Sequence, residues 1–286
     1  MANPSEAVGI YNPEGAPAII AFVLFGAVDG ALWYHYFKMR PRPKWMRCLT
    51  VGCFFMSLGF IIRFSRRHHI NAWAFIFETL FILLSPCAFL AELYILVPHM
   101  SISLNADDCL IINRNAIVAL FITGDIITVL AQIAGTALQA TFGELINIGV
   151  KCTLGGLLVQ LACFGFFFTI LIMFGVRLGR KHGQRPRWGQ DSFRETISCR
   201  AHHWETLYYA LIFSSICMII RTIYRVIEYA GGSEGPLAEN EVCFYILDTI
   251  PMLFLVGIFV FVWPPRCIEE PNCITSPLPM TMTNMK

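Results

Sequence analysis

Long apolar runs separated by short polar segments dominate the sequence. Seven of them are long enough to cross a hydrocarbon layer of about 30 Å at a rise of about 1.5 Å per helical residue. They cover residues 17–37, 45–64, 72–98, 111–138, 149–176, 205–229 and 240–263. The pattern predicts an all-α fold, a bundle of seven transmembrane helices.

The composition fits a multi-pass membrane protein. Of the 286 residues, 56% are hydrophobic and 14% are charged, and the mean hydropathy is +0.62. A soluble domain carries roughly a quarter charged residues, so this class is excluded. We expect residues 1–16 to form a short extracellular or lumenal segment, 17–263 the transmembrane domain and 264–286 a cytoplasmic tail.

Basic residues between the spans set the expected orientation. With the N-terminus outside, the inner loops and the tail carry fifteen Lys and Arg residues and the outer segments carry four. The remaining two, Arg221 and Arg225, lie within a span. The bias predicts an outer N-terminus and a cytoplasmic C-terminus, with only the segment Arg66-Arg67-His68-His69 opposing it.

Charged residues inside the last two spans are the most informative local feature. Arg221, Arg225 and Glu228 have the spacing i, i+4, i+7, so they share one helix face. Glu241 and Asp248 follow on the next span. A charge at membrane depth is costly and must face a partner or a water-filled cavity. The pattern therefore indicates either a buried ion-pair network or a binding cavity.

Counting along each span places most of these polar residues in the outer half of the bilayer. In a network, Arg221 or Arg225 would pair with Asp125, Glu228 or Asp248. In a cavity, we expect the polar wall to comprise Asp125, Gln132, Gln160, Arg221, Arg225, Glu228, Glu241 and Asp248. A second group of candidates comprises Arg63, Glu78, Glu92 and Asp29.

Signatures of common enzyme classes are absent from the sequence. It contains no GxSxG, HExxH, Walker A or GxGxxG motif, and its eleven cysteines form no CxxC pair. We therefore expect no metal, no cofactor and no assigned catalytic residue. Gly26 and Gly30 form a GxxxG motif in the first span, for which we expect packing inside the bundle, with homodimerisation as the alternative.

Several motifs together resemble those of the fungal RTA-like seven-helix proteins, also called lipid-translocating exporters. The resemblance is strongest over residues 221–264, with R-x-x-Y-R-x-x-E, a Gly-x-x-Gly-Pro-Leu turn, Tyr-x-x-Asp and a final Trp-Pro. The D-x6-Q-x-x-G pattern is matched by Asp125, Gln132 and Gly135. Further matches are GGLLVQ, LSPCAFLAELY and Tyr11-x-Pro13.

The sequence departs from this family's pattern in the second span. Members usually carry Glu-x-x-Gly-Tyr-x-x-Arg there, whereas this chain has Met56, Gly59, Phe60 and Arg63. The carboxylate and the phenol are thus replaced and the arginine is kept. Glu78 on the next span is a hypothetical substitute for the missing carboxylate.

The resemblance implies translocation or export of an amphipathic lipid or lipophilic small molecule, such as a sphingoid base, a sterol-like toxin or a secondary metabolite. It implies membrane lipids as neighbours, a plasma-membrane or endomembrane location and no nucleic-acid partner. Two alternatives stay open. One is a membrane-embedded acid-catalysed cyclase or isomerase, and the other is a seven-helix sensor or receptor.

Overall fold

Seven helical spans form the fold, as the apolar pattern predicted. The computed structural model describes residues 15–40, 42–66, 72–104, 106–139, 145–181, 204–231 and 241–269. Its first six spans are α1 (Gly15–Lys38), α2 (Arg47–Arg66), α3 (Ala72–Ser103), α4 (Arg114–Gln139), α5 (Leu145–Lys181) and α7 (Trp204–Ala230). The seventh consists of α8 (Glu241–Phe244), η3 (Tyr245–Thr249) and α9 (Ile250–Phe261). Seven segments are long and apolar enough to cross a membrane.

Short helices adjoin the spans. The turns η1 (Lys44–Met46) and η2 (Asp107–Cys109) precede α2 and α4, and α10 (Pro264–Glu269) follows the last span. The hydroxyl of Ser103 donates a hydrogen bond of 2.9 Å to the carbonyl of Ile268, which ties α10 to the end of α3. The first residues of the expected tail thus pack on the bundle.

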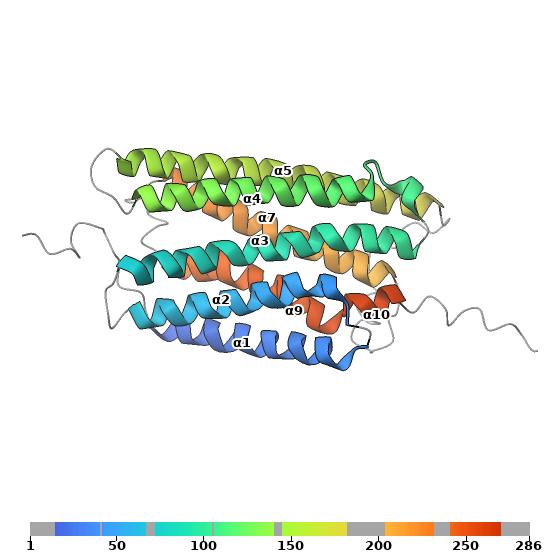
Figure 1. Ribbon diagram of the computed structural model, residues 1–286, viewed down its shortest axis with the longest axis horizontal. Helices are drawn as coiled ribbons and strands as arrows, with labels where there is room; N and C mark the ends of the chain where they lie inside the picture. Colours follow the sequence, from blue (N-terminus) through green and yellow to red (C-terminus); the bar gives the residue numbers. More distant parts are fainter. Residues whose placement is uncertain are drawn as a thin grey trace, which may run out of the picture.

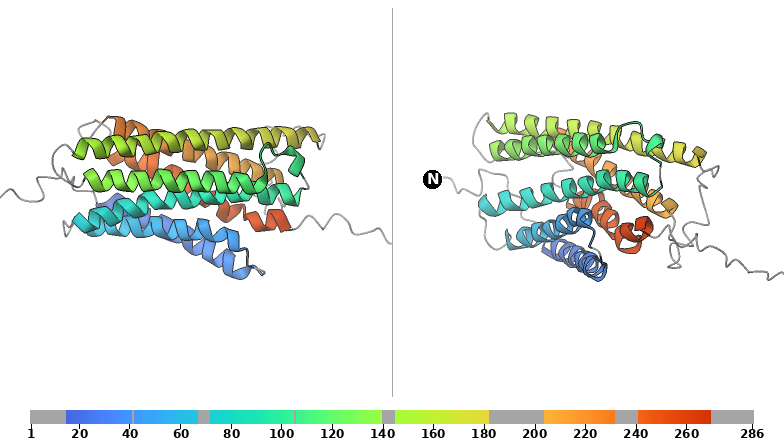
Figure 2. Two further views of the ribbon diagram at one scale, coloured as in Figure 1. Left: turned by 45° about the horizontal axis from the view of Figure 1, so that its top comes forward. Right: turned by 45° about the vertical axis from the view of Figure 1, so that its right-hand side comes forward.

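The helices pack mainly against their neighbours in sequence. Helix α2 lies between α1 and α3, α4 packs along α5, and α7 contacts both α5 and α9 (Figures 1 and 2). Because the chain crosses the bundle seven times, α1 begins at one end and α9 finishes at the other. We call the half of the bundle in which α1 begins the N-terminal half.

Small residues allow α4 and α5 to approach closely. A Cβ added to Gly135 would meet Thr153, and one added to Gly149 would lie 2.6 Å from the carbonyl oxygen of Gly135. Neither position could carry a side chain without displacing the other helix. The close approach brings polar residues of both helices together in the N-terminal half.

The GxxxG motif of α1 faces open space. A Cβ added to Gly26 or Gly30 would meet no atom within 4 Å. The expectation that these glycines pack inside the bundle is therefore wrong, because the adjoining face of α1 is the exposed one, with Val23 57% exposed.

Proline residues shape two spans. Helix α3 continues through Pro86, which lacks the N–H that would normally bond to the carbonyl four residues earlier. The last span contains one π-helical turn, η3, directly before Pro251. Single π turns inside helices occur often at functional sites, and this one carries Asp248.

Candidate functional site

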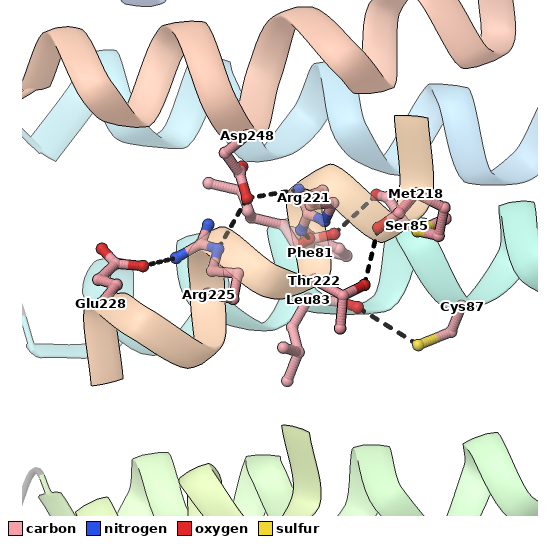
Figure 3. A network of polar contacts seen from close by, with 11 residues as sticks. Phe81, Leu83, Ser85, Cys87, Met218, Arg221, Thr222, Arg225, Glu228 and Asp248 are labelled. Atoms are coloured by element: carbon pink, nitrogen blue, oxygen red, sulfur yellow. Dashed lines mark hydrogen bonds and ion pairs between the residues drawn. The ribbon is translucent and has the colours of Figure 1, made fainter. Parts of the chain in front are cut away.

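Four charged side chains meet between α7 and η3, and we call them the charge cluster: Arg221, Arg225, Glu228 and Asp248 (Figure 3). Nε of Arg225 donates to Oδ1 of Asp248 at 2.7 Å. Nη1 of Arg221 lies 2.8 Å from the same oxygen. Nη1 of Arg225 also donates to Glu228 at 3.0 Å. One carboxylate oxygen thus serves both arginines.

Helical periodicity explains this arrangement. Three of the four residues lie on one face of α7, which the spacing i, i+4, i+7 places opposite η3. Asp248 is 0% exposed and Arg221 is 4% exposed. Charges so far from water are tolerated when they are paired, so the pairing with Asp248 is what permits Arg221 to lie inside the bundle.

A backbone carbonyl of α3 accepts a further hydrogen bond from Arg221. Nη2 of Arg221 donates to the carbonyl oxygen of Ile82 at 3.2 Å. In a regular helix this carbonyl would accept from the N–H of the residue four positions later, which here is Pro86. Proline leaves the acceptor free, and the guanidinium takes it.

A second ion pair joins α2 to α3. Nη1 of Arg63 donates to Oε1 of Glu78 at 2.9 Å, and the two side chains are 12% and 4% exposed. The sequence motif had suggested Glu78 as a substitute for the carboxylate missing at Met56. In the structure, Glu78 binds the arginine that the family pattern retains in α2.

Phe244 connects the ion pair to the charge cluster. The guanidinium carbons of Arg63 and Arg225 lie 4.7 Å and 5.2 Å from the centroid of its ring. Both cations interact with the electron-rich ring. The three arginines Arg63, Arg221 and Arg225 and the three carboxylates Glu78, Glu228 and Asp248 carry formal charges that cancel.

Amide side chains form a separate chain between α4, α5 and α3. Nε2 of Gln132 donates to Oε1 of Gln160 at 2.8 Å, and Nε2 of Gln160 lies 3.9 Å from the sulfur of Cys87. Gln132 is 1% exposed and Gln160 is 7% exposed. The hydrogen bond between the two amides satisfies polar groups for which lipid acyl chains offer no hydrogen-bonding partner.

Asp125 does not take part in the charge cluster. Its carboxylate faces the hydroxyl of Tyr94 on α3. Neither side chain makes a hydrogen bond within the usual distance and angle limits. Of the pairings expected for Arg221 and Arg225, the structure therefore contains those with Asp248 and Glu228.

The other candidates lie apart from both groups. The carboxylate of Glu92 is 0% exposed and faces the backbone N–H of Leu49, in the first turn of α2. Asp29 on α1 lies near Cys53. The backbone of Glu241 begins α8, and its side chain lies outside the described part of the structure.

Residues that bring the site together were missed by reasoning from charge alone. Phe244 belongs to an ordinary apolar run, and no local pattern marks it. Tyr94 ends the LSPCAFLAELY motif, which matched the family but indicated no partner for its hydroxyl. The free carbonyl of Ile82 could have been found, because a proline four residues later predicts it. Within the described residues, no three His, Cys, Asp or Glu side chains are grouped to hold a metal ion.

Comparison with known proteins places the chain in a family. The model of the RTA1 like protein family matches residues 49–271. Protein RTA1 of Saccharomyces cerevisiae is 28% identical over 279 residues, covering 89% of this chain and 84% of its own length. Protoporphyrin uptake protein 1 of the same yeast is 26% identical over 227 residues, covering 79% and 71%.

A third relative is described as a probable lipid transporter. This protein, atnI of Emericella nidulans, is 25% identical over 273 residues, covering 93% of this chain and 69% of its own length. No solved structure matches the chain. Because the family model covers most of the sequence, including the charge cluster and its partners on α3, the chain belongs to the RTA1-like family of membrane proteins.

Proposed function

We propose that this protein translocates or exports an amphipathic lipid or a lipophilic small molecule across its membrane. Sphingoid bases, sterol-like toxins and secondary metabolites are the classes that the family resemblance suggests. The relative described as a probable lipid transporter supports the assignment, as does the family itself.

The observation that carries the proposal is the concentration of buried polar side chains in the N-terminal half. They come from α2, α3, α4, α5, α7 and η3, and they include both ion pairs and the amide pair. A headgroup crossing the bilayer needs replacements for the hydrogen bonds it made with water. In the proposed mechanism the polar side chains provide these bonds while the apolar part of the substrate remains among the acyl chains.

The partly exposed edge of the charge cluster gives it a means to respond to a substrate. Oδ2 of Asp248 makes no hydrogen bond in the described structure, and Arg225 is partly exposed at 19%. A negatively charged headgroup can bind Arg225 in exchange for Glu228, and a positively charged one, such as that of a sphingoid base, can bind Glu228, whose carboxylate is 20% exposed. Asp248 keeps Arg221 and Arg225 paired during either exchange.

The test is a scrambling assay in proteoliposomes. A fluorescent phospholipid and, separately, a fluorescent sphingoid base are placed in both leaflets, and a membrane-impermeant quencher reports how fast the inner pool reaches the outer leaflet. We expect the wild-type protein to accelerate exchange of at least one probe and Arg225→Ala to slow it. Ile127→Ala is the matched control, because Ile127 is 62% exposed on α4.

The outcome is informative in both directions. Equal exchange rates for the wild type and Arg225→Ala would show that the charge cluster does not lie on the substrate path. Exchange no faster than in protein-free vesicles, for every probe, would contradict the proposed function. Arg225→Lys, which keeps the positive charge, separates loss of charge from loss of fold when size-exclusion profiles are compared.

A further inference from the structure

Asp125 is a buried carboxyl group with no counter-ion among the residues that the structure describes. It lies on α4 with 4% of its surface exposed, and neither carboxylate oxygen makes a hydrogen bond within the usual limits. The hydroxyl of Tyr94, which is 0% exposed, faces it from α3 and has no other partner in the described structure.

The groups around Asp125 do not neutralise it. From α3 it is faced by Tyr94 and by the thiol of Cys87, and Gln160 of α5 donates to that thiol. Cys163 of α5 lies near Tyr94. Arg221 of α7 acts electrostatically on Cys87, but it is bound to Asp248 and to the carbonyl of Ile82.

Aromatic rings keep water away from this pair. The ring of Tyr94 lies 5.2 Å from that of Phe121 and 4.6 Å from that of Phe167, measured between centroids. Phe164 is stacked on Phe167 at 5.8 Å. An isolated carboxylate costs far more in such surroundings than the neutral acid does, so the group takes up a proton.

We propose that Asp125 is a proton-binding site, with Tyr94 as its positioning residue, and that substrate movement is coupled to binding and release of one proton there. The inference rests on the proposed function for its coupling step. In that step the O–H bond of the acid breaks, the electron pair stays on the carboxylate oxygen and the proton passes to a water molecule that enters with the substrate headgroup. The Tyr94 hydroxyl then donates a hydrogen bond to the carboxylate.

Two other acidic residues, the buried Glu92 and the half-buried Asp29, differ from Asp125. Glu92 faces the backbone N–H of Leu49, in the first turn of α2. Asp29 lies on α1, away from the polar side chains of α3, α4 and α5, and its nearest titratable neighbour is Cys53. Asp125 alone among the three adjoins the Gln132–Gln160–Cys87 chain, through Cys87.

The first test detects the proton directly and does not depend on transport. Infrared difference spectra of the reconstituted protein between acidic and alkaline buffer should contain a carbonyl band of a protonated carboxylic acid. Asp125→Asn should lose one such band, and Tyr94→Phe should shift it, because its hydrogen-bonding partner is gone. Glu92→Gln should leave this band unchanged. A spectrum of Asp125→Asn identical to that of the wild type would overturn the proposal.

The second test measures coupling. With a probe that the wild type translocates, an imposed pH gradient should change the exchange rate by about fivefold or more, the lower end of usual coupling factors. A trapped pH dye should report proton movement only when the probe is present. In Asp125→Asn the response to the gradient and the dye signal should both vanish.

The outcomes separate the two proposals. Exchange that ignores the gradient in the wild type would refute the coupling and leave the proposed function standing. Absence of exchange for every probe would contradict the proposed function, and the infrared bands would still decide whether Asp125 holds the proton.

Discussion

Arg225 and Asp248 are joined by a hydrogen bond of 2.7 Å from Nε to Oδ1, and the same oxygen also holds Arg221 at 2.8 Å. The two arginines follow each other by one helical turn on α7, so their guanidinium groups would repel if the carboxylate were absent. Asp248 is therefore the residue on which the charge cluster depends.

Replacing Asp248 by Asn should be strongly destabilising. The amide preserves the shape but leaves the buried guanidinium of Arg221 without a counter-ion and Arg225 with Glu228 alone. Removing one partner of a buried ion pair costs about 3–5 kcal/mol in comparable sites. Thermal unfolding of the purified protein in detergent measures the effect as a lower melting temperature. Glu228→Gln is the control, and because that carboxylate is 20% exposed we expect a loss of about 1 kcal/mol or less.

A double substitution checks the cause. Asp248→Asn combined with Arg221→Met removes the carboxylate together with its most deeply buried partner, so part of the lost stability should return. If the loss of stability in the double variant equalled the sum of the losses in the two single variants, repulsion between the arginines could not be the reason for the loss.

Local patterns predicted the helices and one face of the site. The seven apolar runs and the spacing of Arg221, Arg225 and Glu228 depend on neighbours a few residues away, which a sequence displays directly. The sequence does not display the partners of these residues across the bundle. Helix packing placed Asp125 beside Tyr94 rather than beside an arginine, and it exposed Gly26 where internal packing was expected.

Phe244 should stabilise the protein through its two arginine contacts. Phe244→Leu keeps an apolar side chain but removes the ring that faces Arg63 and Arg225, so we expect a loss of about 1–2 kcal/mol. Phe244→Trp retains the interaction if the larger ring fits. The control is Phe254→Leu on α9, which is 57% exposed. Equal changes in melting temperature for the two leucine variants would show that the arginine contacts contribute nothing.

Gly135 should be intolerant of any side chain. Gly135→Val would force Thr153 and the backbone near Gly149 away, and we expect a loss of about 1–3 kcal/mol or failure to accumulate in the membrane. Gly155→Val is matched in chemistry and lies on α5, where an added Cβ meets nothing within 4 Å. Expression level and detergent melting temperature provide the readout. Similar behaviour of both variants would mean that helix propensity, rather than the close approach, is responsible.

The orientation of the bundle is open to a direct test. The expected cytoplasmic side carries fifteen basic residues and the other side carries four. This bias predicts that the N-terminus lies outside and the C-terminus in the cytoplasm. An Asn-x-Ser/Thr acceptor placed ahead of α1 should then be glycosylated in a eukaryotic host, and one placed between α5 and α7 should not. A glycosylated site between α5 and α7 would invert the assignment. The charge cluster would then lie near the cytoplasmic surface.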